Sequence, residues 1–137
     1  MDVRVWTEDL SVGNGLLDQH HQRLFALLGE VSRVVETNGT LAAVAGLVAE
    51  LNTYVAYHFA EEEAMMDKAG FPFLDLHRHS HQTIAMRVDD FAQALTEATH
   101  LTVARELCTF LSGWLFHHIE IEDFEYRPYV GGAVHEG

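Results

Sequence analysis

The sequence is poor in cysteine and proline. The single cysteine, Cys108, excludes an internal disulfide and fits a reducing, cytoplasmic setting. With only two prolines and 48% hydrophobic residues among 137, the chain is neither disordered nor collagen-like. One domain with a hydrophobic core is expected.

Long hydrophobic runs are also missing. The longest run without a polar side chain, residues 41–49, is far shorter than the roughly 18 to 20 residues of a membrane-spanning helix. Charged residues between Asp2 and Asp9 interrupt the amino terminus, which argues against a secretory signal. We therefore expect a soluble protein without membrane insertion.

Positive charge is scarce. Eight basic residues against 21 acidic ones give a formal net charge of −13. Phosphate backbones and anionic lipid surfaces repel such a chain. Neither nucleic acid nor a membrane surface is an expected partner.

Hydrophobic residues recur at three- and four-residue steps in four long segments, a pattern typical of amphipathic helices. The expected helices span residues 16–37, 41–67, 74–97 and 102–126. An amino-terminal arm, residues 1–15, precedes them, Thr40 can cap the second helix, and Gly131-Gly132 is expected to end the fold. Long helices with short connections predict an all-α protein, an antiparallel up-down-up-down four-helix bundle with an N-terminal arm.

Histidine is abundant, with ten residues in the chain. Each expected helix carries histidine on its apolar face. These inward histidines are His21, His58, His77, His81 and His118. A buried polar group without a partner costs about 1 to 3 kcal/mol, and a metal ion would be a partner that all five could share.

The spacing of the acidic and histidine residues strengthens the metal hypothesis. His58 and Glu62 are four residues apart, as are His77 and His81. Each pair therefore projects from one helix face, one turn apart. Adding His21, His118 and one acidic residue of the last helix makes seven nitrogen and oxygen ligands, which suit iron, zinc, copper or manganese. Because seven ligands are too many for one ion, two ions bridged by carboxylates are expected.

The acidic ligand of the last helix is ambiguous from periodicity. Glu122 lies four residues after His118 and so on the same face of an α-helix, whereas Asp123 lies about 140° from His118 around the helix. Helical periodicity alone therefore favours Glu122.

Several distinct short motifs are distributed along nearly the whole chain. They are Val5-Trp6, Leu10-Ser11-Val12-Gly13, Asp18-Gln19-His20-His21 with Leu24-Phe25, His58-Phe59 with Glu62-Glu63, Gly70-Phe71-Pro72, His77 with His81, Trp114 with His118-Ile119, and Asp123 with Tyr126. Together they resemble the bacterial-type hemerythrins, a family of non-heme di-iron proteins that bind oxygen. The family places a carboxylate five residues after the last histidine, so the resemblance favours Asp123 over Glu122.

The resemblance also implies how the ligands are shared. His77, His81 and His118 would hold one iron, and His21 and His58 the other. Glu62 and Asp123 would bridge the two non-heme iron ions together with an oxo or hydroxo group. Dioxygen would bind at the open position of the second iron.

Residues within a helical turn of the ligands are expected to form the wall of a dry pocket for dioxygen. They are Leu24, Phe25, Trp114 and Ile119. His20 departs from the family, which usually has glutamine before the first histidine ligand. His21 lies on the same helix face as Leu17, Leu24 and Leu28, so helical periodicity favours His21 as the ligand. His20 is expected to be able to approach the site without being a ligand.

Other polar residues are expected at the surface. Glu61 and Glu63 are interpreted as a solvated helix face, and the same holds for His79, His100, His117 and His135.

The expected function is reversible dioxygen binding for storage or delivery, without enzyme activity. One alternative is an oxygen or redox sensor module that acts on a signalling or acceptor protein. Another is a di-iron peroxidase or oxidase.

Overall fold

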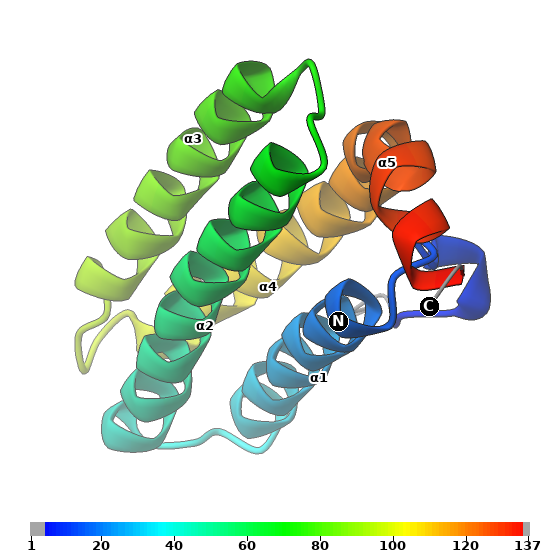
Figure 1. Cartoon of the computed structure of the whole chain (residues 1–137). Helices are drawn as coiled ribbons and strands as arrows, with labels where there is room; N and C mark the ends of the chain where they lie inside the picture. The colour runs from blue at the N-terminus through cyan, green and yellow to red at the C-terminus, as the bar shows by residue number, and fades with distance from the viewer. Residues whose placement is uncertain (1–4, 136–137) are drawn as a thin grey trace.

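The computed structural model describes residues 5–135, so residues 1–4 of the predicted arm and residues 136–137 lie outside the described part. Every element in it is helical (Figure 1). The elements are η1 (Glu8–Leu10), α1 (Gly15–Glu36), α2 (Leu41–Lys68), α3 (Leu74–Gln93), α4 (His100–His118), η2 (Ile119–Asp123) and α5 (Phe124–His135).

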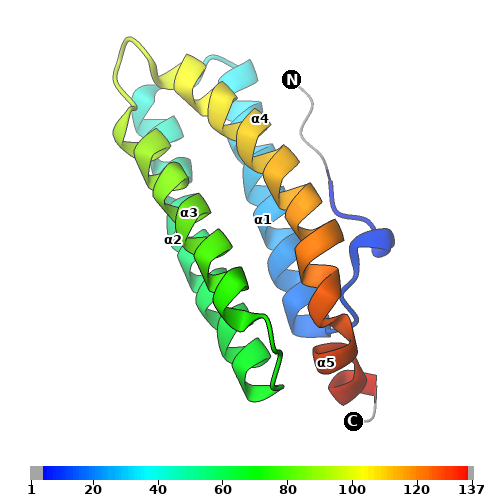
Figure 2. The same cartoon turned by 90° about the horizontal axis from the view of Figure 1, so that it is seen from above.

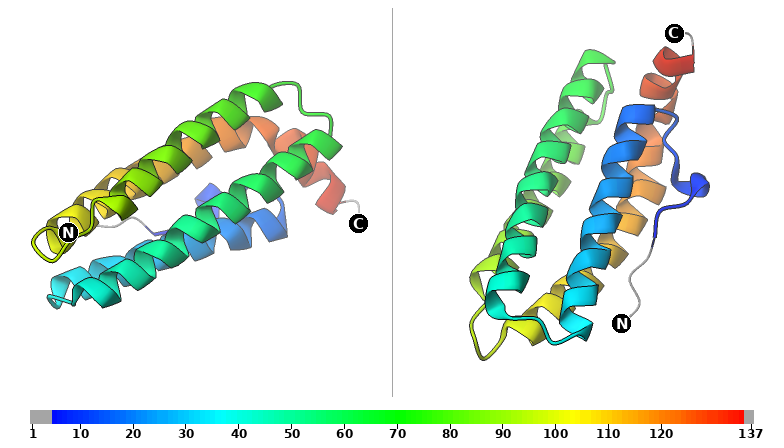
Figure 3. Two further views of the ribbon diagram at one scale, coloured as in Figure 1. Left: turned by 90° about the vertical axis from the view of Figure 1, so that its left-hand side faces the viewer. Right: turned by 90° about the horizontal axis from the view of Figure 1, so that it is seen from below.

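Helices α1 to α4 form an antiparallel four-helix bundle, which confirms the predicted fold class (Figures 1 and 2). Each helix contacts the next one in the chain, and α1 also contacts α4, which closes the bundle. Figure 3 shows that the α1–α2 and α3–α4 connections lie at one end, whereas the α2–α3 connection and α5 lie at the other. The antiparallel order therefore places the starts of α1 and α3 beside the ends of α2 and α4.

Side-chain caps define where the first two long helices begin. The Asn14 carboxamide oxygen accepts hydrogen bonds from the backbone N–H groups of Leu16 and Leu17. Thr40 caps α2 as predicted, because its hydroxyl accepts a hydrogen bond from the Ala43 N–H. Such caps satisfy backbone donors that have no partner within the helix.

The arm is fastened to the start of α1. Asp18 accepts hydrogen bonds from the Ser11 hydroxyl at 2.6 Å and from the Val12 N–H at 2.9 Å. Leu10 and Val12 are buried, and Trp6 packs partly against the core. The arm lies on the α1 and α4 side of the bundle (Figures 2 and 3).

Helix boundaries differ from the expectation in the second half of the chain. Helix α3 ends at Gln93 rather than near 97, and α4 begins at His100 rather than near 102. Thr96 and Thr99 hold the connection, since each hydroxyl accepts a hydrogen bond from the other's backbone N–H. After α4 the helical backbone continues through η2 and α5 to His135, beyond the expected end near residue 126. The prediction that Gly131-Gly132 ends the fold is therefore wrong.

No helix among the described residues is both long enough and apolar enough to cross a membrane.

Candidate metal centre

The seven side chains that resemble hemerythrin ligands converge inside the bundle, near the end where α2 connects to α3. All seven are buried. Their ligand-type atoms fall into two groups that share one carboxylate: Glu62, His77, His81, His118 and Asp123 in the first, and His21, His58 and Glu62 in the second. The same division of histidines follows from the resemblance, and ligation itself remains a prediction.

Glu62 lies between the two groups of histidines. Its Oε1 is 3.0 Å from His81 Nε2 and 3.4 Å from His77 Nε2. Its Oε2 is 3.2 Å from His21 Nε2 and 3.4 Å from His58 Nε2. The two oxygens of one carboxylate therefore face different sets of imidazoles.

Asp123 repeats this arrangement from the other side of the bundle. Its Oδ1 is 2.8 Å from His77 Nε2 and 3.1 Å from His118 Nε2. Its Oδ2 is 3.3 Å from His21 Nε2. Every one of the five imidazoles thus directs Nε2 at one or both of these carboxylates.

The local geometry of the last helix explains why Asp123, and not Glu122, points inward. Residues Ile119–Asp123 form a π-helical segment inside an otherwise continuous helix. A π-helix closes its turn between residues i and i+5, so Asp123 lies over His118. The extra residue overturns the choice that α-helical periodicity alone favours.

Glu122 still contacts the cluster, from outside. Its carboxylate meets His118 Nδ1, the ring nitrogen opposite the one that faces Asp123. Ser80 on α3 donates a hydrogen bond to the same carboxylate at 3.1 Å. Glu122 is therefore placed to orient His118 rather than to join the central group.

Glu63 has the same relation to His81. The distance from Glu63 Oε2 to His81 Nδ1 is 2.8 Å, and Glu63 is only partly exposed. The interpretation of Glu63 as a solvated residue is therefore wrong, whereas Glu61 is exposed as expected. Carboxylates in this position fix the tautomer and orientation of metal-binding histidines.

His20 is buried and contacts His58. The two Nδ1 atoms are 3.1 Å apart, and the rings meet edge to face. Tyr54 and Tyr57 cover the other side of His20, with ring centroids 5.9 and 5.3 Å away. His20 therefore fills the space between the predicted ligand His58 and the protein surface.

Two buried oxygens in the cluster accept no hydrogen bond. They are Glu62 Oε1 and Asp123 Oδ2, in side chains with no exposed area. Tyr126 donates a hydrogen bond to the remaining Glu62 oxygen at 2.7 Å. Unsatisfied buried oxygens beside imidazole nitrogens are a set of donors that fits metal cations.

The electrostatics of the cluster are dominated by its two carboxylates. Burial lowers the pKa of an imidazole, yet the neighbouring carboxylates of Asp123 and Glu62 raise the pKa of His21 and of His77 to about 9. For His118 the charge of Asp123 outweighs burial and raises the pKa to about 10. His58 differs, because burial prevails and lowers its pKa to about 4.

The pKa values of the two carboxylates are shifted downward. Burial alone would raise their pKa values, but the surrounding imidazoles hold the pKa of Glu62 and that of Asp123 below the usual range. The centre therefore presents two ionised carboxylates, which is the charge state that binds cations.

Three of the four predicted pocket-wall residues are buried, and the fourth, Trp114, is partly buried. Leu24, Phe25 and Ile119 are buried, and the Trp114 ring stacks on His118 with centroids 4.3 Å apart. Phe59, which the sequence reasoning did not assign to the wall, stacks on His81 at 3.8 Å. Its position next to His58 in the sequence was the available signal.

Three further histidines, His79, His100 and His117, lie away from the cluster, whereas the side chain of His135 lies outside the described part of the chain. His79 and His117 are exposed, as expected. His100 is buried, against the expectation, and its Nε2 lies 2.9 Å from the Gly39 carbonyl oxygen. It joins the start of α4 to the α1–α2 connection, a contact between segments that are distant in sequence.

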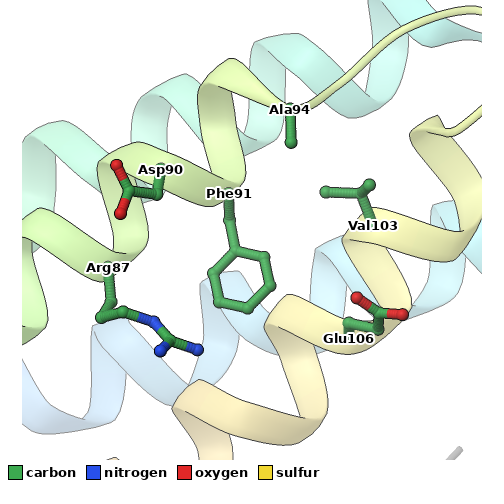
Figure 4. A pocket seen from close by; sticks show the side chains of 6 residues that line it. All are labelled: Arg87, Asp90, Phe91, Ala94, Val103 and Glu106. Atoms are coloured by element: carbon green, nitrogen blue, oxygen red, sulfur yellow. The ribbon is translucent and has the colours of Figure 1, made fainter.

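A surface hollow of about 270 Å³ lies at the other end of α3 and α4 (Figure 4). Its walls include Phe91 and the acidic residues Asp90 and Glu106, and Arg87 lies over the Phe110 ring at 4.7 Å. None of the seven converging side chains lines it.

Four antiparallel helices around buried histidines and two shared carboxylates define a bundle protein equipped to bind metal ions. The family profile described as "Hemerythrin HHE cation binding domain" matches residues 12–130. The chain therefore belongs to the hemerythrin family.

Individual relatives agree with this assignment. A bacteriohemerythrin of Stenotrophomonas maltophilia (strain R551-3) is 35% identical over 136 residues, which are 99% of this chain and 87% of that protein. A myohemerythrin of Riftia pachyptila is 31% identical over 123 residues, 90% of each chain. A crystal structure of wild-type hemerythrin, 21% identical, shares the fold with a TM-score of 0.82 over 95% of this chain and 99% of that one.

Deleting Ile121, an exposed residue of the π-helical segment, tests the role of that segment. The deletion leaves Asp123 four residues after His118, so a regular α-helix would still direct both inward. We expect the variant to retain helicity and the wild-type number of metal ions per chain, measured by circular dichroism and elemental analysis.

The matched control is deletion of Gly113, an exposed residue of α4 before His118. This deletion rotates both His118 and Asp123 by about 100° relative to the start of α4, and metal content should fall. Loss of metal after Ile121 deletion with helicity retained would contradict the proposed register.

The raised histidine pKa values predict how the stability of metal-free protein changes with pH. Between pH 6.5 and about 10, folded His21, His77 and His118 hold protons that the unfolded chain has released. Their stabilisation is complete below pH 6.5 and is lost as the pH rises through 9 to 10. The melting temperature of metal-free protein should therefore fall by several degrees between pH 7 and 10.

Metal-loaded protein is the comparison for this titration. A bound cation replaces the imidazole protons, so its melting temperature should vary much less over the same range. If the melting temperatures of the two samples fell in parallel with rising pH, the protons of these histidines would not be the ones that the metal replaces.

Proposed function

We propose that the cluster holds two iron ions and that the protein binds dioxygen reversibly. One observation carries the proposal: Glu62 and Asp123 each direct one oxygen toward His77 and its neighbours, and the other toward His21. Carboxylates arranged in this way suit a pair of cations better than a single one. The cation-binding description of the family profile and the names of the relatives support the same conclusion.

The proposed ligands are distributed unequally. His77, His81 and His118 with one oxygen from each carboxylate offer five donors, whereas His21 and His58 with the other two oxygens offer four. The second position thus has room for an exogenous ligand. Two ferrous ions would supply the two electrons that dioxygen takes up on binding.

The chain itself contributes geometry and exclusion of water. Glu63 and Glu122 hold the outward nitrogens of His81 and His118, and Tyr126 holds Glu62. Leu24, Phe25, Ile119 and Trp114 are proposed to line the pocket and keep it dry, because water and protons promote the loss of bound oxygen as peroxide.

A binding role is proposed in preference to catalysis. The proposed terminal ligands are all histidines, and few anionic groups are available among them to stabilise the high-valent iron that oxidases require. The only proposed anionic protein ligands, Glu62 and Asp123, are shared between the two positions.

The deciding measurement is iron content together with the visible spectrum of the anaerobically reduced protein. We expect two irons per chain and a charge-transfer band that appears with oxygen and disappears when oxygen is flushed away. Rapid oxidation without a stable oxygenated form would reject the carrier proposal, and a chain that takes up no iron would reject the di-iron site.

Replacing a proposed ligand provides the control for this spectrum. In His58→Ala we expect iron affinity to fall about tenfold or more and the oxygen-dependent band to vanish. Full iron content with an unchanged band would remove His58 from the ligand set. His79→Ala, which changes an exposed histidine, should behave as wild type.

Ile119→Ser tests the proposed dry wall. Ile119 is fully buried next to His118, and a hydroxyl there should admit water and speed irreversible oxidation of the oxygenated protein severalfold. The decay of the oxygen-dependent band measures this rate.

Ile121→Ser is the matched control, because Ile121 belongs to the same segment but is half exposed. Its decay rate should stay at the wild-type value. Equal rates for Ile119→Ser and the wild type would exclude Ile119 from the wall.

A further inference from the structure

His20 stands where the family usually has glutamine, and the proposed function gives it no role. It is nevertheless 4% exposed and lies in α1 directly before His21. Its Nδ1 is 3.1 Å from His58 Nδ1 on α2. A contact at this distance is a hydrogen bond, in which one ring donates and the other accepts.

The orientation of His58 decides which ring donates. His58 Nε2 faces Glu62 at the centre of the cluster. A histidine that gives its Nε2 lone pair to a cation carries its proton on Nδ1. His58 Nδ1–H must then donate, and His20 Nδ1 must accept, which leaves the His20 proton on Nε2.

We propose that His20 is a positioning residue that fixes the tautomer and ring orientation of His58 for metal binding. The inference rests on the proposed metal site and deepens it. His20 acts through His58 and is not itself a ligand.

The packing around His20 supports this role. Its ring is wedged between His58 and the tyrosines 54 and 57, all at ring-centroid distances below 6 Å. Beyond these tyrosines lies an open surface pocket that also includes Ala49, Glu50 and Thr53. His20 therefore separates Nδ1 of His58 from solvent, which would otherwise compete for its proton.

The arrangement also makes the two proposed metal positions unequal. His81 and His118, on the three-histidine side, donate to the carboxylates Glu63 and Glu122. His58, on the two-histidine side, donates to a neutral imidazole. A hydrogen bond to an anionic acceptor makes the imidazole more basic and so a stronger metal ligand. The metal held by His21 and His58 should therefore be the more weakly bound of the two.

The direct test is ¹⁵N NMR of the wild-type protein loaded with zinc, a diamagnetic probe of the site. We expect His58 to be protonated on Nδ1 and zinc-bound through Nε2, and His20 to be protonated on Nε2 alone. A proton on His20 Nδ1, or zinc bound to His58 through Nδ1, would overturn the proposal.

Substitution provides a second, independent test. His20→Leu removes the acceptor, and we expect the affinity for one of the two zinc ions to fall about 10- to 100-fold in competition with a chelator. His20→Gln supplies a carbonyl acceptor and should retain near wild-type affinity for both ions. Wild-type affinity in His20→Leu, or equal weakening in the two variants, would contradict the acceptor role.

His100→Leu is the matched control, since His100 is a buried histidine at the other end of α4, about 27 Å along the helix axis from His118. It should bind both zinc ions as the wild type does. If the wild-type chain binds no metal, both the proposed function and this inference fail. If the wild type binds two zinc ions but His20 carries its proton on Nδ1, this inference alone fails.

Discussion

Two ionised carboxylates, Glu62 and Asp123, lie without solvent contact at the centre of the bundle, and the surrounding structure compensates their charge. An isolated buried carboxylate is strongly unfavourable. Five imidazoles face these two groups. The carboxylates raise the pKa of an imidazole such as His21, and the imidazoles lower the pKa values of Glu62 and Asp123. Protons or metal cations can both satisfy this centre, so we expect metal binding, pH and stability to be linked in this protein.

The bundle topology makes such a centre possible. Antiparallel packing places the starts of α1 and α3 beside the ends of α2 and α4, so the proposed ligands from four helices meet at one level. The opposite end of the bundle has no comparable cluster among the described residues. There, His100 and the Thr96–Thr99 pair hold the connections together, so the proposed ligand His118 and the structural histidine His100 occupy opposite ends of α4.

A layer of outer contacts then orients the inner residues. Glu63, Glu122 and His20 each meet the Nδ1 atom of a proposed ligand, and Tyr126 donates to Glu62. Such partners hold the imidazoles in one tautomer before any metal arrives. The three-histidine side has two anionic partners and the two-histidine side has a neutral one, so the fold itself distinguishes the two positions.

Much of this arrangement was readable from the sequence because helical periodicity is a local property. Apolar residues at three- and four-residue steps predicted the four helices, and His21, His58, His77, His81 and His118 shared phase with those residues. The pairs His58–Glu62 and His77–His81 followed from the four-residue spacing alone. The motifs also supported the resemblance to hemerythrins, and with it the choice of Asp123.

Only the tertiary structure decided the features that depend on contacts between helices. The π-helical segment turns Asp123 inward, and α-helical periodicity contains no signal for an extra residue in a turn. Glu63 and His100 looked like surface residues because their partners, His81 and the Gly39 carbonyl, come from other segments. The partner of His20 is likewise on another helix. A sequence specifies which face a residue occupies, whereas what that face meets is set by packing.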